Sequence, residues 1–257
     1  MEFYMAAKSD VGTVKKINQD SYCMKSAATT IGNLVMAVIC DGMGGLKKGE
    51  VASSRVMLAF QNWFDNRLPK LVGNFRIELV KEEWASLVAQ ENRGILDFSR
   101  QQNLSMGTTL TAVLFVDKYL LLCCHVGDSR LYRIEETITQ LTKDHTWVAR
   151  EVRENRLTLE EARVHPNRNM LLQCIGVTPQ VQADYFVQPL APEETYLLCS
   201  DGFRHKISAE EIAVFLSPER LTGEGEIASR IEEMIQINMC RGERDNITAI
   251  VIKTKDS

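Results

Sequence analysis

Four hydrophobic runs of this chain each border an aspartate, and this arrangement constrains the fold more than any other feature. The runs cover residues 35–40, 120–126, 196–200 and 247–252. The aspartates beside them are Asp41, Asp128, Asp201 and Asp245, the first three in Asp-Gly or Gly-Asp pairs. Short apolar runs bounded by turn residues are typical of buried strands, so each aspartate is expected at a strand end. One sheet edge would then gather carboxylates that repel one another unless cations neutralise them.

These carboxylates predict a site for a pair of divalent cations. An oxygen-rich set of ligands favours magnesium or manganese over zinc, which prefers His or Cys. The sharpest motif is Asp41-Gly42-Met43-Gly44-Gly45, because its glycines let the backbone approach a ligand closely. Each motif taken singly has an alternative interpretation as a turn. The joint pattern indicates a metal-dependent phosphohydrolase.

Composition narrows the class of protein further. The 257 residues are near the upper size of one hydrophobic core, and no repeat or linker divides them, so a single domain over 1–257 is expected. A net charge of −4 without a Lys/Arg-rich stretch argues against binding nucleic acid or a membrane. The seven cysteines lie mostly in apolar runs, which is typical of a reducing compartment. We therefore expect a cytoplasmic monomer.

The periodicity predicts strands and helices in separate blocks. Strands are expected near 34–40, 109–116, 119–126, 130–134, 195–199 and 247–253, with weaker candidates near 20–25 and 181–187. A hairpin turn is expected at 116–119. Helices are expected in a pattern that stops before Pro69, over 77–98, after capping boxes at Thr158 and Ser208, and over 225–240. This order favours an α+β fold of packed antiparallel sheets covered by helices.

The ordered motifs also resemble a known family. They include Asp10-Val11-Gly12, Lys15, Asn18-Gln19-Asp20, Asp41-Gly42-Met43-Gly44-Gly45, Met106-Gly107-Thr108-Thr109, Gly127-Asp128-Ser129-Arg130, Ser200-Asp201-Gly202 and Arg244-Asp245-Asn246. From about residue 8 to 253 the chain resembles the PPM family of metal-dependent protein serine/threonine phosphatases, also called protein phosphatase 2C, and its bacterial branch in particular.

The resemblance implies a fold and a site. The fold would be a central antiparallel β-sandwich flanked by helices on both faces, in four layers, with a mobile flap within 145–178. Asp41 would bridge two Mn²⁺ or Mg²⁺ ions, with the Gly42 carbonyl on one of them. Asp201 and Asp245 would complete one ion's ligands, and Asp20 would hold metal-bound water. Asp128 with Asp201 would offer a third, weaker metal position.

The implied reaction is hydrolysis of phosphoserine or phosphothreonine by direct attack of a water that bridges the two cations. Phosphorylated proteins would be the substrates, and the enzyme would reverse a bacterial Ser/Thr kinase. Lys15 stands where the family has a phosphate-binding arginine, and lysine cannot make the bidentate contact of arginine. Gln19 replaces a frequent glutamate, and Met43 cannot act as a general acid.

Two alternatives to a protein phosphatase stay open at this point. Lys15 and Gln19 would also suit a catalytically weak domain that binds phosphoproteins as a regulator, although all the core aspartates are present. A phosphohydrolase that acts on small phosphate esters is the other. The histidines have weaker claims: His125 is expected in the core, and His165 in the flap is expected to be structural.

Overall fold

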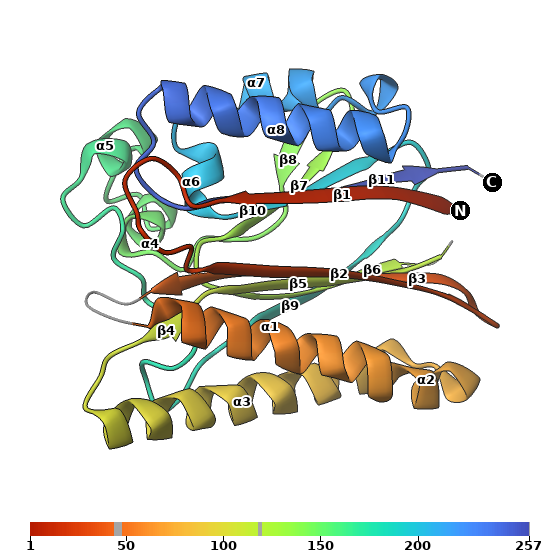
Figure 1. Cartoon of the computed structure of the whole chain (residues 1–257), viewed down its shortest axis with the longest axis horizontal. Coiled ribbons are helices and arrows are strands. Elements are labelled where there is room, and N and C mark those ends of the chain that lie inside the picture. The colour runs from red at the N-terminus through yellow and green to blue at the C-terminus, as the bar shows by residue number, and fades with distance from the viewer. Residues whose placement is uncertain (44–47, 118–119, 257) are drawn as a thin grey trace.

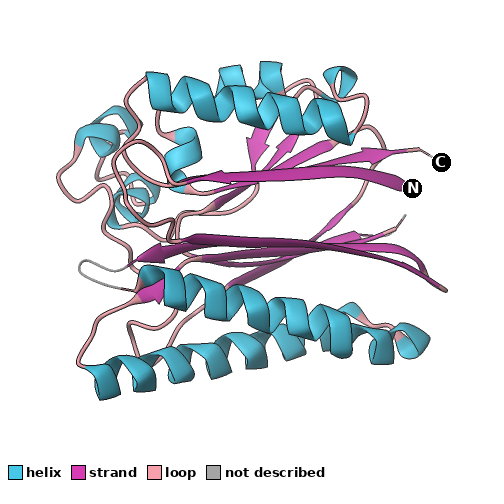
Figure 2. Cartoon of the chain, viewed as in Figure 1, coloured by secondary structure: helices cyan, strands magenta, loops and turns pink. Residues whose placement is uncertain are grey.

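In the computed structural model, two antiparallel β-sheets face each other, and helices cover the outer face of each (Figures 1 and 2). The structure describes residues 1–43, 48–117 and 120–256. The predicted α+β sandwich of four layers is confirmed. None of the helices within these ranges is long and apolar enough to cross a membrane.

The first sheet has the strand order β1-β11-β10-β7-β8. Its strands are β1 (Glu2–Asp10), β11 (Ile247–Lys255), β10 (Thr195–Cys199), β7 (Arg130–Ile134) and β8 (Ile138–Gln140). The helices α7 (Ala209–Phe215) and α8 (Glu224–Cys240) cover it (Figure 1). β11 is buried on both faces, because Ala249 and Val251 pack toward the helices while Ile250 and Ile252 pack between the sheets. Burial on both faces explains why this strand reads as a continuous apolar run.

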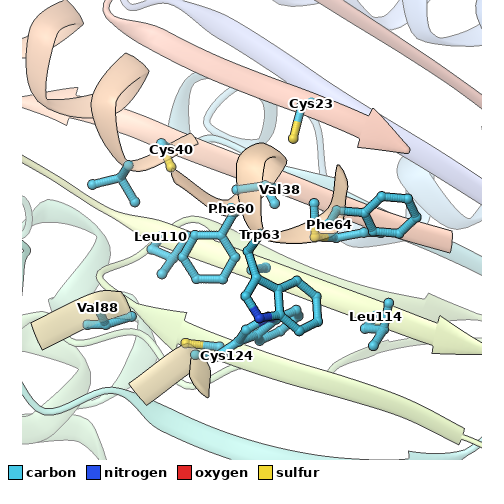
Figure 3. Close-up of a cluster of buried hydrophobic side chains, with 14 of the residues drawn as sticks. Cys23, Val38, Cys40, Phe60, Trp63, Phe64, Val88, Leu110, Leu114 and Cys124 are labelled. Carbon is cyan, nitrogen blue, oxygen red and sulfur yellow. The ribbon is translucent and has the colours of Figure 1, made fainter. Parts of the chain in front are cut away.

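The second sheet has the order β2-β3-β5-β6-β9. Its strands are β2 (Asp20–Thr29), β3 (Gly32–Met43), β5 (Leu110–Val116), β6 (Leu120–Val126) and β9 (Asp184–Pro189), and the short β4 (Gly107–Thr108) pairs with the end of β3. The helices α1 (Gly49–Asn66) and α3 (Ile77–Gln102) cover it. Phe60 and Trp63 of α1 lie against Leu110 and Leu114 of β5 (Figure 3). Trp84 of α3 contacts both aromatic rings edge-on, so the two helices and the sheet share one core.

The shorter elements complete the chain. They are α2 (Leu68–Leu71), η1 (Val72–Asn74), α4 (Trp147–Arg153), α5 (Leu159–Val164), α6 (Asp201–Arg204) and η2 (Pro218–Arg220). Both predicted capping boxes form: Thr158 caps α5 with Glu161, and Ser208 caps α7 with Glu211. The helices predicted over 77–98 and 225–240 are α3 and α8.

Some of the sequence predictions need correction. The first helix stops before Pro69 as expected, but the short helix that contains this proline was not predicted. α1 ends at Asn66, and Pro69 lies in the first turn of α2, a position that needs no backbone N–H donor. β1 and β8 were not predicted, and β9 begins at Asp184 instead of 181. β5 and β6 pair as the predicted hairpin, but residues 118 and 119 of its turn lie outside the described residues, as do Gly44 and Gly45.

Candidate metal centre

The five predicted aspartates lie at one end of the sandwich, but they come from both sheets. Asp20 opens β2 and pairs in register with Asp41 of β3, and Asp128 follows β6. Asp201 begins α6 directly after β10, and Asp245 precedes β11 in the other sheet. The expectation of a single sheet edge was therefore wrong, because the two pairs of neighbouring strands belong to different layers. The charges of Asp20, Asp128, Asp201 and Asp245 all act on Asp41, and α6, which begins at Asp201, lies at the end of the sandwich away from the chain termini (Figure 1).

The main chain of Asp41 is fixed by hydrogen bonds, and none of the described residues makes a hydrogen bond to its carboxylate. The Asp41 N–H donates to Thr109 Oγ1 at 2.9 Å. Its carbonyl accepts from the Thr109 N–H at 2.9 Å and from Thr108 Oγ1 at 3.0 Å. The two threonines of the Met106-Gly107-Thr108-Thr109 motif thus position the aspartate, and the carboxylate remains available for a ligand.

Gly42 lies where no side chain fits. Its N–H donates to the Gln19 carbonyl at 3.1 Å. A Cβ at this position would come within 2.4 Å of the carbonyl oxygens of both Gln19 and Gly49. The Gln19 side chain donates to Glu50 Oε2 at 3.4 Å, so the amide that replaces a frequent glutamate serves the start of α1. Close backbone approach at Gly42 keeps its carbonyl beside Asp41.

The carboxylates at this end repel one another. Burial raises the pKa of Asp41 well above its ordinary value, and the charges of Asp20, Asp201, Asp128 and Asp245 add to the effect. Burial also raises the pKa of Asp20 to about 7, although the Thr248 hydroxyl donates to Asp20 Oδ2 at 2.6 Å and opposes the shift. Such a cluster favours bound cations.

One positive side chain already lies among these groups. Lys15 Nζ is 2.9 Å from Asp245 Oδ1. Burial disfavours the charge of Lys15, but Asp245, Asp41 and Asp201 outweigh burial and raise its pKa. This one ammonium group offsets only part of the charge of Asp41, Asp201 and Asp245, so negative charge remains in excess.

His205 and Glu243 join Asp201 to Asp245, and the sequence analysis missed both. His205 Nε2 is 3.4 Å from Asp201 Oδ2, and His205 Nδ1 is 3.4 Å from Glu243 Oε2. Glu243 Oε1 accepts the N–H groups of Arg244 at 2.7 Å and Asp245 at 2.9 Å. Despite its burial, these contacts lower the pKa of Glu243 to about 2. The i,i+4 spacing of His205 from Asp201 was the available signal, but it required knowing that α6 is helical.

Asp128 has a different environment from the other aspartates. Burial and the charge of Asp201 raise its pKa to about 7, and Arg204 is the first group that opposes the shift. Arg204 Nη2 donates to the Asp128 carbonyl at 3.0 Å and lies 3.6 Å from its carboxylate oxygen Oδ2. A positive side chain of the protein therefore contacts this aspartate directly.

The donors present suit a hard divalent cation. Carboxylates and a backbone carbonyl are the ligands that magnesium and manganese prefer. Over the ranges that the structure describes, three or more His, Cys, Asp or Glu side chains do not converge on one point as a preformed metal site. The site suits such an ion because its ligand atoms would be oxygens and because negative charge is in excess there.

The remaining candidates have structural roles in this conformation. His125 is fully buried in β6, as predicted. His165 stacks on Trp147 with ring centroids 4.7 Å apart, and its Nδ1 accepts the Asn167 N–H. The segment 145–178 carries α4 and α5, and its mobility stays a prediction.

Comparison with known proteins identifies the family. Residues 13–252 match the family model described as Protein phosphatase 2C. The chain is 30% identical over 250 residues to the serine/threonine phosphatase stp of Listeria monocytogenes, covering 96% of this chain and 94% of that protein. The crystal structure of the Mycobacterium tuberculosis serine/threonine phosphatase PstP superposes with a TM-score of 0.79 at 33% identity, covering 99% of each chain. A structure of the PstP catalytic domain in complex with two manganese ions has a TM-score of 0.78 at 31% identity, again covering 99% of each chain.

A helix-covered β-sandwich with aspartates at one end is the architecture of these metal-dependent phosphatases. The chain belongs to the protein phosphatase 2C family.

Proposed function

We propose that this chain is a metal-dependent protein phosphatase that hydrolyses phosphoserine and phosphothreonine in proteins. The observation that carries the proposal is the excess of carboxylates over positive side chains at the end of a protein phosphatase 2C fold. Asp245, Asp41 and Asp201 all act on Lys15 there, Asp20 lies beside them, and the PstP catalytic domain, a relative, has been solved in complex with two manganese ions.

Asp41, the Gly42 carbonyl, Asp201 and Asp245 would hold two ions, either manganese or magnesium. When bound, such ions lower the pKa of a water molecule and offset charge on the phosphoryl oxygens. Asp20 would accept a hydrogen bond from water at the ions, in addition to those from the Thr248 and Ser200 hydroxyls. Thr108 and Thr109 would keep the Asp41 main chain in place during the reaction.

Lys15 would contact the phosphate of the substrate. Its Nζ lies beside Asp245, so the same ammonium can reach a phosphate held near that carboxylate. As a point charge it orients a phosphate less than a bidentate arginine would. We therefore expect Lys15→Met to raise KM more than it lowers kcat.

Phosphorylated proteins, including a Ser/Thr kinase, would be the substrates, and the enzyme would act in the cytoplasm as a monomer. A regulatory domain that binds phosphoproteins without turnover is the second candidate. The replacements at Lys15 and Gln19 favour that candidate, whereas the presence of every core aspartate opposes it.

The test is manganese-dependent phosphate release from a phosphothreonine peptide. Wild type should release phosphate, and Asp41→Asn and Asp245→Asn should each lower kcat/KM by at least about 100-fold, because the loss of a ligand costs more than the loss of a supporting contact. Asp97→Asn is the control, since this exposed carboxylate on α3 pairs only with Arg100 in the contacts found.

If folded wild type released no phosphate at any manganese or magnesium concentration, the proposed enzymatic activity would be contradicted. Phosphopeptide binding without turnover would then favour the regulatory domain. Faster turnover of nucleotides than of phosphopeptides would instead indicate a phosphohydrolase for small esters.

A further inference from the structure

Asp128 is held by an arginine. Arg204 Nη2 donates to the Asp128 carbonyl at 3.0 Å and lies 3.6 Å from Asp128 Oδ2. Both side chains are only 13% exposed, so little water screens this pair. Within the described part of the chain, Arg204 Nε is buried and has no hydrogen-bond partner. The guanidinium therefore depends on its contacts with Asp128 to offset the cost of its burial.

A second arginine completes a balanced cluster around the same point. Arg130 makes a bidentate contact with Asp144, Nε to Oδ1 at 2.9 Å and Nη2 to Oδ2 at 2.7 Å. Arg204 Nη2 also lies 3.9 Å from Asp144 Oδ2. Two guanidinium groups thus face two carboxylates, and the formal charge of the cluster is zero.

The balance of positive and negative charge around Asp128 differs from the balance around Asp41. There, the described positive groups near the four carboxylates of Asp20, Asp41, Asp201 and Asp245 are Lys15 and, beside Asp201, His205, so negative charge remains in excess and bound cations would offset it. At Asp128 the protein supplies the charge itself. A divalent ion at this position would have to displace a guanidinium whose nearest other carboxylate, Asp144, already accepts two hydrogen bonds from Arg130.

The position of Arg204 is fixed by the same helix that presents Asp201. α6 has four residues, begins at Asp201 and ends at Arg204. The buried Asn238 side chain of α8 donates to the Phe203 carbonyl at 2.8 Å and holds this turn in place. Because Asp201 and Arg204 belong to one short turn, the main chain of Arg204 keeps its place relative to Asp201, and its side chain reaches Asp128 from there.

We propose that Arg204 takes the place of a cation at Asp128, so that Asp128 is an arginine-bound structural carboxylate and this chain binds two metal ions and no third. The inference rests on the proposed metal site around Asp41. It corrects the expectation that Asp128 and Asp201 form a third metal position.

The test is the number of manganese ions bound per folded chain, measured by equilibrium dialysis and metal analysis up to millimolar free Mn²⁺. Wild type should bind two ions, and Asp128→Asn should also bind two with unchanged affinity. Arg204→Met, which keeps the aliphatic part of the side chain, should gain one weaker ion. Arg204→Lys should keep two, because it restores the positive charge.

Two further variants make the result specific. The double variant Arg204→Met with Asp128→Asn should return to two ions, which places the extra ion at Asp128. Arg241→Met is the matched control, because this exposed arginine pairs with Glu211 away from the site and its loss should leave two ions. A wild type that binds three ions and loses one in Asp128→Asn would overturn the inference even if Arg204→Met fails to fold. A wild type that binds none would contradict the proposed metal site, and the inference with it.

Discussion

His125 shows how one buried side chain makes stability depend on pH. It lies in β6 with no exposed surface. Nε2 is 3.2 Å from the Lys143 carbonyl, which can only accept, so the proton of the neutral ring is on Nε2. Nδ1 then accepts from the Thr111 hydroxyl at 3.0 Å, and the single proton of this hydroxyl is shared with the Ser129 carbonyl at 3.1 Å. Burial, followed by the neighbouring His145, lowers the pKa of His125 to about 4. The folded protein therefore holds this histidine neutral.

The sign of the pH effect follows from the difference between the pKa of this histidine in the folded protein and its pKa in the unfolded chain. In the unfolded chain a histidine binds its proton below pH about 6.5, whereas in the folded protein His125 does so only near its lowered pKa. The contribution of His125 to the free energy of unfolding is therefore largest above pH 6.5 and is lost as the pH falls, by on the order of 3 kcal/mol at pH 4. We expect the free energy of unfolding of His125→Gln to fall less than that of wild type between pH 7.5 and pH 4.5. Urea denaturation at both pH values measures this difference. His165→Gln is the control, and an equal pH dependence in wild type and His125→Gln would contradict the assignment.

α6 illustrates how an element of four residues sets the geometry of the site. A Cβ on Gly202 would come within 2.1 Å of the Asn246 carbonyl oxygen. The turn of α6 and the loop before β11 therefore touch through their backbones, and this contact brings Asp201 close to Asp245. Only glycine allows so close an approach.

Gly202→Ala should separate these two elements. We expect it to lower the free energy of unfolding by roughly 1–3 kcal/mol, as for overpacking of a core, and to weaken manganese binding as well. Gly225→Ala is the matched control: it lies in the first turn of α8, its Cβ would have no atom within 4 Å, and its stability should be unchanged or higher by up to about 1 kcal/mol. Urea denaturation and calorimetric titration with Mn²⁺ check both effects. A Gly202→Ala protein as stable as Gly225→Ala would contradict the close contact.

The elements also differ in how well the sequence predicts them. β3 and β11 are buried on both faces, so their apolar runs identify them without further information. β1 is an edge strand whose residues are mostly half-exposed, and its partner β11 lies at the other end of the chain. α6 is too short to show a periodicity. The aspartates of the site were predictable because each borders a strand, whereas the contacts of Arg204, His205 and Glu243 depend on the tertiary structure.

At the scale of the whole molecule, the proposed metal ions would connect the two sheets. Asp20 and Asp41 belong to one sheet, and Asp201 and Asp245 flank strands of the other. Without cations, like charges of the two sheets lie close together at this end of the sandwich, and among the described residues Lys15 and His205 offset only part of them. Ions bound there would replace repulsion between the sheets by attraction to a shared ligand, so the fold itself should respond to metal.

Stability should therefore rise with manganese and fall again with EDTA. An ion that binds only the folded chain adds about 2.7 kcal/mol at a free concentration 100 times its Kd. Asp41→Asn should lose most of this gain. In EDTA, however, it should be more stable than wild type by on the order of 1 kcal/mol, because the raised pKa of Asp41 means that its charge costs free energy in the folded state at neutral pH. Asp97→Asn should behave as wild type in both conditions. Thermal unfolding with and without Mn²⁺ measures these differences, and an Asp41→Asn protein that is less stable than wild type in EDTA would show that the carboxylates do not repel one another across the two sheets.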